Sequence, residues 1–432
     1  MSKKPEKQKR KKKQHSTSTG VRRFLMVLLS VVALCMTVLV IYTLKYSTTD
    51  PTLAEGKTNY WAPEVSTIAT EATLDIEVTE PTEPENPALY EAQRELDTMS
   101  LEEKVYQLFF VTNRELTGEY YANTAGEATR TALETKPVGG IVFDSDNIFD
   151  SEQLKQMIAD SQSYSKLPLF IGVEEEGGFN SYLNKIGVTR NYSEMGVYGD
   201  EKNTQRVYEI GKEIGTAITD VGFNIDLAPV ADTLTNIYNT EIARRAFSTE
   251  SSTTASLVLE MVKGLHSANC MACLKYFPGL SASNMDSRYG TAVSNQTYEE
   301  LNDYLFPFII GIQNDAEMVM VSHLCLPSIV GENRPADLCP EIVDGLLRGQ
   351  LGYDGVVMTD SFQKGAISYN YDVGDAAVAA IDAGCDIIYM PDDLDKAAAA
   401  IIDAVDSGVL TEERINESVL RILILKYNHG LL

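Results

Sequence analysis

The stretch Gly355-Val-Val-Met-Thr-Asp360 is a short apolar run, rich in β-branched residues, that ends on an acidic side chain. A run of this length that is apolar on both faces is typical of a strand buried in a parallel sheet. Seven further runs of this kind precede or follow it: Gln107–Thr112, Gly139–Phe143, Leu169–Glu174, Asn224–Val230, Cys270–Phe277, Glu317–His323 and Cys385–Met390. The sequence therefore predicts eight buried strands.

Helical patterns separate these runs and follow the last of them. They cover residues 152–163, 203–221, 253–268, 298–313, 340–348, 374–383, 395–406 and 412–427. Strands that alternate with helices over about 340 residues predict an α/β fold of the (β/α)₈ type, the TIM barrel. A doubly wound open sheet is the alternative, but the number of strands and the lack of a Gly-rich phosphate-binding motif after the first strand argue against it. Ser100 and Glu103 have the spacing of a capping box that opens an early helix, and we place the barrel domain at residues 89–432.

The part of the chain before this domain changes composition twice. Residues 1–23 are basic and polar, residues 24–42 contain no charged side chain, and residues 43–88 are rich in Thr, Pro and Glu. The uncharged run is long enough to cross a bilayer, the basic residues before it favour a cytoplasmic tail, and the third segment reads as a disordered linker. We therefore expect a single-pass cell-membrane protein with a cytoplasmic N-terminus and an extracytoplasmic barrel. A cleaved signal peptide is the alternative, but no Ala-x-Ala-like site follows the run.

Charge and cysteine content restrict the partners. The chain has 36 Lys and Arg against 62 Asp and Glu, a formal net charge of −26, which argues against a nucleic-acid-binding protein. Cys270 and Cys273 have the spacing of half a zinc site, but no second pair accompanies them, so buried strand residues are the simpler interpretation. His266 and His429 have no partners at ligand spacing. We expect no metal, no organic cofactor and a monomer.

Polar residues recur where the predicted strands end. In a (β/α)₈ barrel the carboxyl ends of the strands form the face that carries the active site. The residues concerned, including one in the loop after the fourth strand, are Glu174, Asp232, Arg245, Lys275, His323 and Asp360. Helix capping would explain any one of them, but six on one face indicate a site for a polar, hydroxyl-rich ligand.

Several motifs resemble those of one enzyme family. Lys275-Tyr-Phe-Pro-Gly279 and Met358-Thr-Asp-Ser361, with Glu176-Gly-Gly178 and Arg245-Ala-Phe247 before them, resemble glycoside hydrolase family 3 in its one-domain β-N-acetylhexosaminidase form. The resemblance implies retaining hydrolysis of cell-wall amino-sugar glycosides, with a cell-wall glycan or muropeptide as the partner. It implies Asp360 as the nucleophile. The substrate-binding residues we expect are Glu174, Arg245, Lys275, Tyr276 and His323.

One departure from the family pattern affects the chemistry. The family's general acid/base is a His in an Asp-Ser-His motif, and here the motif is Asp286-Ser-Arg288. Asp286 is then a remnant of the acid/base dyad, because Arg does not exchange a proton near neutral pH. Three interpretations stay open: a glycosidase with another proton donor (Asp286, Glu174 or Tyr276), an inactive barrel that binds cell-wall glycan or acts as a scaffold, and an unrelated barrel enzyme that uses Lys275 as a Schiff-base amine.

Overall fold

The computed structural model describes residues 86–432. The first helix, α2 (Pro87–Leu96), begins slightly before the predicted boundary at residue 89 and is capped by Asn86, whose side chain accepts from Leu89 N at 3.0 Å. The predicted capping box is confirmed: it opens α3 (Leu101–Gln107), with Ser100 and Glu103 each bonding the backbone N–H of the other. The basic tail, the predicted span and almost all of the predicted linker lie outside the described residues. Among residues 86–432, no helix is both long and apolar enough to cross a membrane.

Eight parallel strands form one sheet, in the order β10-β1-β2-β3-β4-β5-β7-β9. Hydrogen bonds from Ile387 N to Val357 O and from Thr359 N to Ile387 O join β9, at one end of this order, to the residue directly before β10, at the other end. The sheet thus nearly closes into a TIM-like barrel. Each predicted run contains one of these strands. They are β1 (Phe109–Val111), β2 (Gly140–Phe143), β3 (Phe170–Val173), β4 (Ile225–Asp226), β5 (Met271–Phe277), β7 (Met318–Val321), β9 (Val356–Thr359) and β10 (Ile388–Tyr389).

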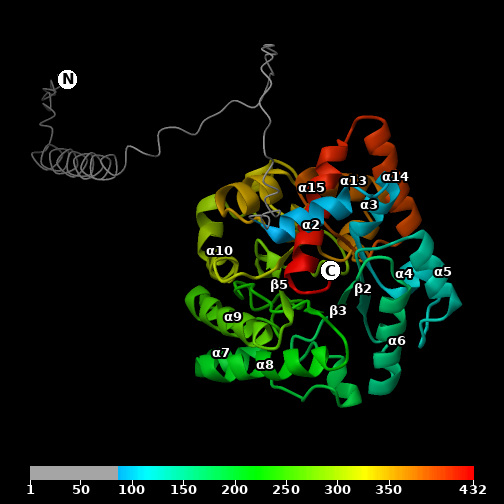
Figure 1. Cartoon of the computed structure of the whole chain (residues 1–432). Helices are drawn as coiled ribbons and strands as arrows, with labels where there is room; N and C mark the ends of the chain where they lie inside the picture. The colour runs from blue at the N-terminus through cyan, green and yellow to red at the C-terminus, as the bar shows by residue number, and fades with distance from the viewer. Residues whose placement is uncertain (1–85) are drawn as a thin grey trace, which may run out of the picture. The chain divides into compact units, whose positions relative to one another are not determined.

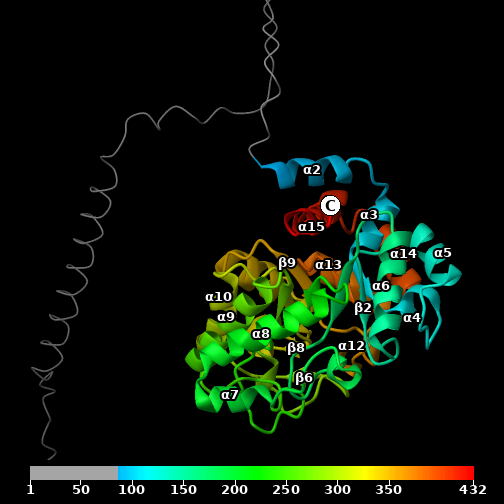
Figure 2. The same cartoon turned by 60° about the horizontal axis from the view of Figure 1, so that its bottom comes forward.

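Helices surround the barrel in both views (Figure 1, Figure 2). The long ones match the predicted segments: α6 (Ser151–Tyr164), α8 (Thr204–Thr219), α9 (Ser251–His266), α10 (Tyr298–Ile312), η5 (Glu341–Gln350, a π-helix), α13 (Val373–Ala383), α14 (Leu394–Asp406) and α15 (Glu412–Asn428). The sequence analysis did not predict α5 (Glu127–Thr135), which completes the first strand–helix unit. Short elements occupy the connections: α4 (Asn113–Thr117), η2 (Leu183–Ile186), α7 (Met195–Glu201), η3 (Leu280–Ala282), β6 (Ala292–Val293), β8 (Leu324–Cys325), α11 (Pro327–Val330), η4 (Ala336–Leu338) and α12 (Gly365–Ser368).

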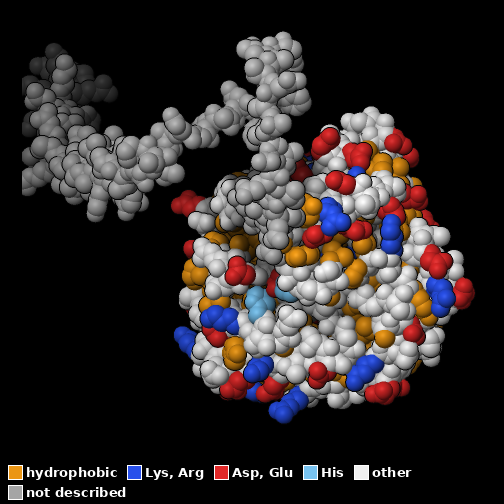
Figure 3. All heavy atoms as spheres, in the orientation of Figure 1, with side chains coloured by type: hydrophobic (Ala, Val, Ile, Leu, Met, Phe, Trp, Pro, Cys, Tyr) orange, Lys and Arg blue, Asp and Glu red, His pale blue; other side chains and the backbone are white. Residues whose placement is uncertain are grey.

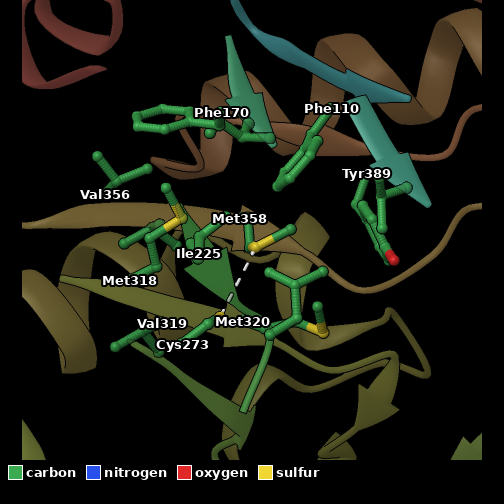
Figure 4. Packing of buried hydrophobic residues seen from close by; sticks show 14 of the residues in the cluster. Phe110, Phe170, Ile225, Cys273, Met318, Val319, Met320, Val356, Met358 and Tyr389 are labelled. Carbon is green, nitrogen blue, oxygen red and sulfur yellow. Dashed lines mark hydrogen bonds between the residues drawn. The ribbon is translucent and has the colours of Figure 1, made fainter. Parts of the chain in front are cut away.

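The interior of the barrel is filled by apolar side chains. Figure 4 shows Phe110, Cys273, Met320 and Met358, which come from four strands and pack together. The thiol of Cys273 lies 3.7 Å from the sulfur of Met358, and because β5 and β9 are not neighbours in the sheet this contact crosses the interior. Gly172 makes room for this layer, since a Cβ there would lie 2.5 Å from the ring of Phe110. Cys270 and Cys273 are buried and free, as the strand interpretation predicted.

The opposite end of the barrel, where the strands begin, brings together two histidines that the sequence left without partners. His266 Nε2 and His429 Nε2 lie 3.0 and 3.2 Å from the two carboxylate oxygens of Glu317, which directly precedes β7. The His266 and His429 interactions lower the pKa of Glu317 to about 2 although burial alone would raise it. Figure 3 shows histidine side chains at the surface, on the face crossed by α15, among interspersed acidic and basic groups.

Candidate active site

A pocket of about 330 Å³ opens at the carboxyl ends of the strands, where the sequence analysis placed the site. Residues from the loops after β2, β3, β4, β5, β9 and β10 line it. Its wall includes the charged and phenolic side chains of Glu174, Glu241, Arg245, Tyr276, Arg288, Asp360 and Lys364.

Asp360 directly follows β9 and presents its carboxylate to the pocket. Its backbone N–H donates to Val321 O at 2.9 Å, which ties the end of β9 to β7. The carboxylate accepts from Ser361 N at 2.7 Å and from Lys364 Nζ at 2.6 Å. The side chain of Asp360 is only 3% exposed, so these two donors hold the carboxylate in one orientation. A fixed, charged carboxylate at this place has the form that a nucleophile requires.

Lys364 and Glu241 are site residues that the sequence analysis missed. The ammonium group of Lys364 also lies 2.7 Å from Glu241 Oε1, and Glu241 in turn accepts from the backbone and the hydroxyl of Ser287 at 2.9 Å. Burial alone would raise the pKa of Glu241, but Lys364 and Ser287 lower it to about 2. Lys364 follows Asp360 by four positions, and this helical spacing was the sequence signal that could have identified it. Glu241 is 123 positions from Lys364, and only the fold brings the two together.

Arg245 and Glu176 form a buried pair beside the pocket. Arg245 binds the carboxylate with two nitrogens, at 2.8 Å for Nε and 2.5 Å for Nη2, and Nη2 also donates to the hydroxyl of Tyr276 at 2.5 Å. Burial opposes ionisation of Glu176, but Arg245 and Lys275 outweigh it and lower the pKa of Glu176 to about 2. Arg245 and Tyr276, both predicted as substrate contacts, line the pocket. The pairing leaves their orientation fixed before any ligand enters.

Lys275, predicted as a substrate contact, does not line the pocket, and its direct role in substrate binding stays a prediction. Its side chain is fully buried, and its ammonium group lies 2.5 Å from Glu176 Oε1 and 3.2 Å from Glu174 Oε2. Burial lowers its pKa, but Glu174 and Glu176 outweigh burial and raise it above its usual value. A Schiff-base lysine needs a neutral, accessible amine, which disfavours that interpretation. Lys275 instead holds Glu174, which does line the pocket with 23% of its side chain exposed.

His323, also predicted as a substrate contact, does not line the pocket either, and that role stays a prediction. The ring is fully buried between two partners: Nδ1 lies 2.9 Å from Asp337 Oδ2, and Nε2 lies 2.8 Å from Ser361 O. His323 thus supports the segment that follows Asp360. Asp232, the remaining strand-end acid, is also buried outside the pocket wall, where it accepts from Ser281 N at 2.9 Å and where burial raises its pKa to about 7.

Arg288 occupies the pocket wall at the position of the family's acid/base residue. Its guanidinium binds Asp286 through Nε at 2.8 Å and Nη2 at 2.5 Å. The Arg288 side chain is 48% exposed while Asp286 is buried and does not line the pocket. The hydrogen bonds to Asp286 raise the pKa of Arg288 still further. The predicted remnant dyad is therefore an ion pair that presents a permanent positive charge to the pocket.

The fold and these motifs agree with a match to one family. Residues 100–425 match the model described as the glycosyl hydrolase family 3 N terminal domain. The chain belongs to glycoside hydrolase family 3. The resemblance seen in the Lys275–Gly279 and Met358–Ser361 motifs is thereby confirmed.

Relatives within family 3 include enzymes named for amino-sugar glycosides. Beta-hexosaminidase A of Pseudoalteromonas piscicida is 29% identical over 317 residues, covering 67% of this chain and 53% of that protein. Beta-hexosaminidase LpqI of Mycobacterium tuberculosis is 30% identical over 304 residues, covering 67% and 76%. The solved family 3 beta-N-acetylglucosaminidase from Paenibacillus sp. str. FPU-7 superimposes with a TM-score of 0.73 at 32% identity, covering 77% of this chain and 63% of that one. The chain thus spans about half the length of the first of these relatives.

Proposed function

We propose that this family 3 chain is a membrane-anchored β-N-acetylhexosaminidase that acts on cell-wall amino-sugar glycosides with retention of configuration. The observation that carries the proposal is the fixed carboxylate of Asp360 on the wall of a pocket that is also lined by Glu174, Arg245 and Tyr276. Such a set suits a sugar, since carboxylates and guanidinium groups form charge-assisted hydrogen bonds with hydroxyls. The names of the relatives support an N-acetylhexosamine as the sugar.

The proposed chemistry has two steps. Asp360 attacks the anomeric carbon, the bond to the leaving oxygen breaks with its electron pair, and a glycosyl ester forms; water then hydrolyses the ester and releases the sugar. The first step needs a proton for the leaving oxygen unless the leaving group is already acidic. Arg288 does not supply it, and the pKa values of Glu174 and Glu241 are held below their usual range. We therefore expect turnover of activated glycosides and slow turnover of natural ones.

An inactive glycan-binding or scaffold barrel is the second candidate. Two ion pairs favour it: Arg288 with Asp286 replaces the proton relay, and Lys364 lies 2.6 Å from the carboxylate that would attack. Both pairs leave the sugar-binding wall of the pocket in place.

Trapping of the glycosyl-enzyme separates the two candidates. The protein is incubated with dinitrophenyl N-acetyl-glucosaminide and, separately, with a 5-fluoro derivative of N-acetyl-glucosaminyl fluoride. The leaving groups of both compounds, dinitrophenolate and fluoride, depart without a proton donor. We expect slow release of dinitrophenol and, in the intact mass, one added glycosyl group that digestion locates on Asp360. Asp360→Asn is the control and should lose both signals. If the parent forms no adduct and releases no dinitrophenol, the enzyme proposal is overturned in favour of the binding barrel.

The membrane anchor is proposed from the uncharged run at residues 24–42 and the basic residues before it. Protease added to intact cells should remove the barrel and leave a protected N-terminal fragment. Protection of the entire chain would show that the proposed orientation is wrong.

A further inference from the structure

Three of the four most exposed tyrosines among residues 86–432 lie on three loops at the carboxyl ends of the strands. Tyr238 is 80% exposed in the loop after β4, Tyr289 is 71% exposed in the loop after β5, and Tyr369 is 73% exposed directly after α12. The stability of the barrel gains little from a ring that remains in water. Exposed apolar surface that is gathered in one region often marks a binding site.

Backbone and side-chain hydrogen bonds fix these loops against one another. Asn236 Nδ2 donates to Asn284 Oδ1 at 2.7 Å and to Ser283 O at 3.1 Å, which joins the loop of Tyr238 to that of Tyr289. Gly365 N donates to Arg288 O at 3.1 Å, which joins the loop of Tyr289 to α12. The three rings therefore stand on one connected support.

The position of Gly365 shows how closely the third tyrosine approaches this support. A Cβ on Gly365 would lie 2.6 Å from the ring of Tyr369 and 2.9 Å from Arg288 O. The absent side chain thus leaves room for the ring of Tyr369 beside the backbone of Arg288. The guanidinium carbon of Arg288 lies 5.6 Å from the centre of the Tyr289 ring.

The loops that carry the three tyrosines also contribute to the pocket wall. Arg288, Thr240 and Lys364 line the pocket wall, and each is within a few residues of one of the three tyrosines. A chain that left the pocket on the side of Arg288 would meet the loops that carry these rings. Tyrosine combines an apolar ring face with a polar hydroxyl, and a pyranose likewise has apolar C–H faces and hydroxyls around its edge.

We propose that Tyr238, Tyr289 and Tyr369 form an accessory glycan-binding platform, which holds further sugar units of a polysaccharide whose terminal unit occupies the pocket. The proposal rests on the proposed function only in taking the pocket ligand to be an N-acetylhexosamine. It adds that the ligand is a chain of several units and that binding strengthens with chain length.

The test measures affinity as a function of chain length. The full-length protein in detergent is titrated calorimetrically with N-acetylglucosamine and with its linear β-1,4-linked oligomers up to the hexamer. We expect the parent to bind the hexamer at least about tenfold more tightly than the monomer, as the loss of a few aromatic anchors commonly costs this much. In the variant Tyr238→Ala/Tyr289→Ala/Tyr369→Ala the ratio of the two affinities should fall to about threefold or less.

Two controls accompany the triple variant. Tyr90→Ala removes a 51% exposed tyrosine from α2, which packs against α15 and carries no part of the pocket, and it should keep the tenfold ratio. The variant Tyr238→Phe/Tyr289→Phe/Tyr369→Phe should also keep most of the ratio of hexamer to monomer affinity, because the aromatic ring faces remain. Melting temperatures should stay close to that of the parent, since exposed side chains contribute little to stability.

The outcomes separate the platform from the enzyme. Loss of the length dependence in the triple variant supports the platform even if no glycoside is hydrolysed. A parent that binds the monomer and the hexamer equally, or that binds neither, overturns the platform, as does a triple variant that keeps the tenfold ratio; turnover of dinitrophenyl N-acetyl-glucosaminide would still stand as a separate result.

Discussion

Lys275→Met should destabilise the barrel far more than Lys426→Met, although both ammonium groups are fully buried. The two lysines differ in what surrounds them. Lys275 lies 2.5 Å from Glu176 and 3.2 Å from Glu174. Lys426, in α15, has one hydrogen bond, to Gln107 Oε1 at 2.8 Å, and lies 5.0 Å from the centre of the Phe170 ring. The substitution and the side-chain length are the same, so the comparison isolates the electrostatic surroundings.

The expected size of each effect follows from these partners. Removal of Lys275 leaves Glu176 buried with Arg245 as its remaining ion-pair partner, and it leaves the partly exposed Glu174 without its ion pair. Breaking a buried ion pair from one side costs about 3–5 kcal/mol. Among residues 86–432 Lys426 has no acidic partner, and burial lowers its pKa to about 7. A lysine whose folded pKa is depressed lowers the free energy of unfolding. This loss is complete below the folded pKa and fades as the pH rises toward the unfolded pKa of about 10.4. Lys426→Met removes this penalty and loses one hydrogen bond worth about 1 kcal/mol, so at pH 7 we expect a change no worse than about 1 kcal/mol.

Urea unfolding, followed by circular dichroism at pH 7 and pH 5, measures both effects. The loss in the Lys275 variant should shrink at pH 5, because the freed glutamates then take up protons in the folded state, whereas in the parent the pKa of Glu176 stays near about 2. Equal losses in the two variants, or a Lys275→Met variant as stable as the parent at pH 7, would refute the assignment of Lys275 as the internal counter-ion of the site.

Three further predictions concern the pocket and the opposite end of the barrel. Arg288→His restores a proton-exchanging group beside Asp286 and should raise the turnover of natural glycans, by up to about 10²-fold, more than that of dinitrophenyl glycosides; equal changes in steady-state rates for both substrates would contradict the reasoning. Arg245→Lys keeps the charge but loses the two-nitrogen contact with Glu176, so glycan affinity measured by calorimetry should fall about tenfold, and an unchanged affinity would place the sugar elsewhere. Glu317→Gln removes the carboxylate charge whose hydrogen bond raises the pKa of His266. That stabilisation is complete below a pH of about 6.5 and is lost as the pH rises through the folded pKa. The melting temperatures of parent and variant should therefore differ more at pH 6 than at pH 8.5, and a difference independent of pH would contradict this.

The sequence by itself determined the barrel and the position of Asp360, the proposed nucleophile, at the end of one of its strands. Strands buried on both faces must be apolar almost throughout, so Gly355–Asp360 and seven similar runs were visible without any knowledge of their neighbours. Asp360 was identifiable because a strand end and a local motif coincide there. The first strand–helix unit was the exception: α5 is short and its surroundings gave no clear periodicity.

Only the tertiary structure decided which strand-end groups face the pocket and which support it. Lys275 and its neighbour Tyr276 are adjacent in the chain, yet the ammonium group is sealed against two glutamates while the phenol ring lines the pocket. The partners that fix these roles are distant in sequence, as are Glu241 from Lys364 and Glu317 from His429. Local sequence patterns follow from the burial of each segment. Whether a charged side chain faces the pocket depends on which distant segments the barrel brings within a few ångströms of it, and the fold of the whole chain sets those contacts.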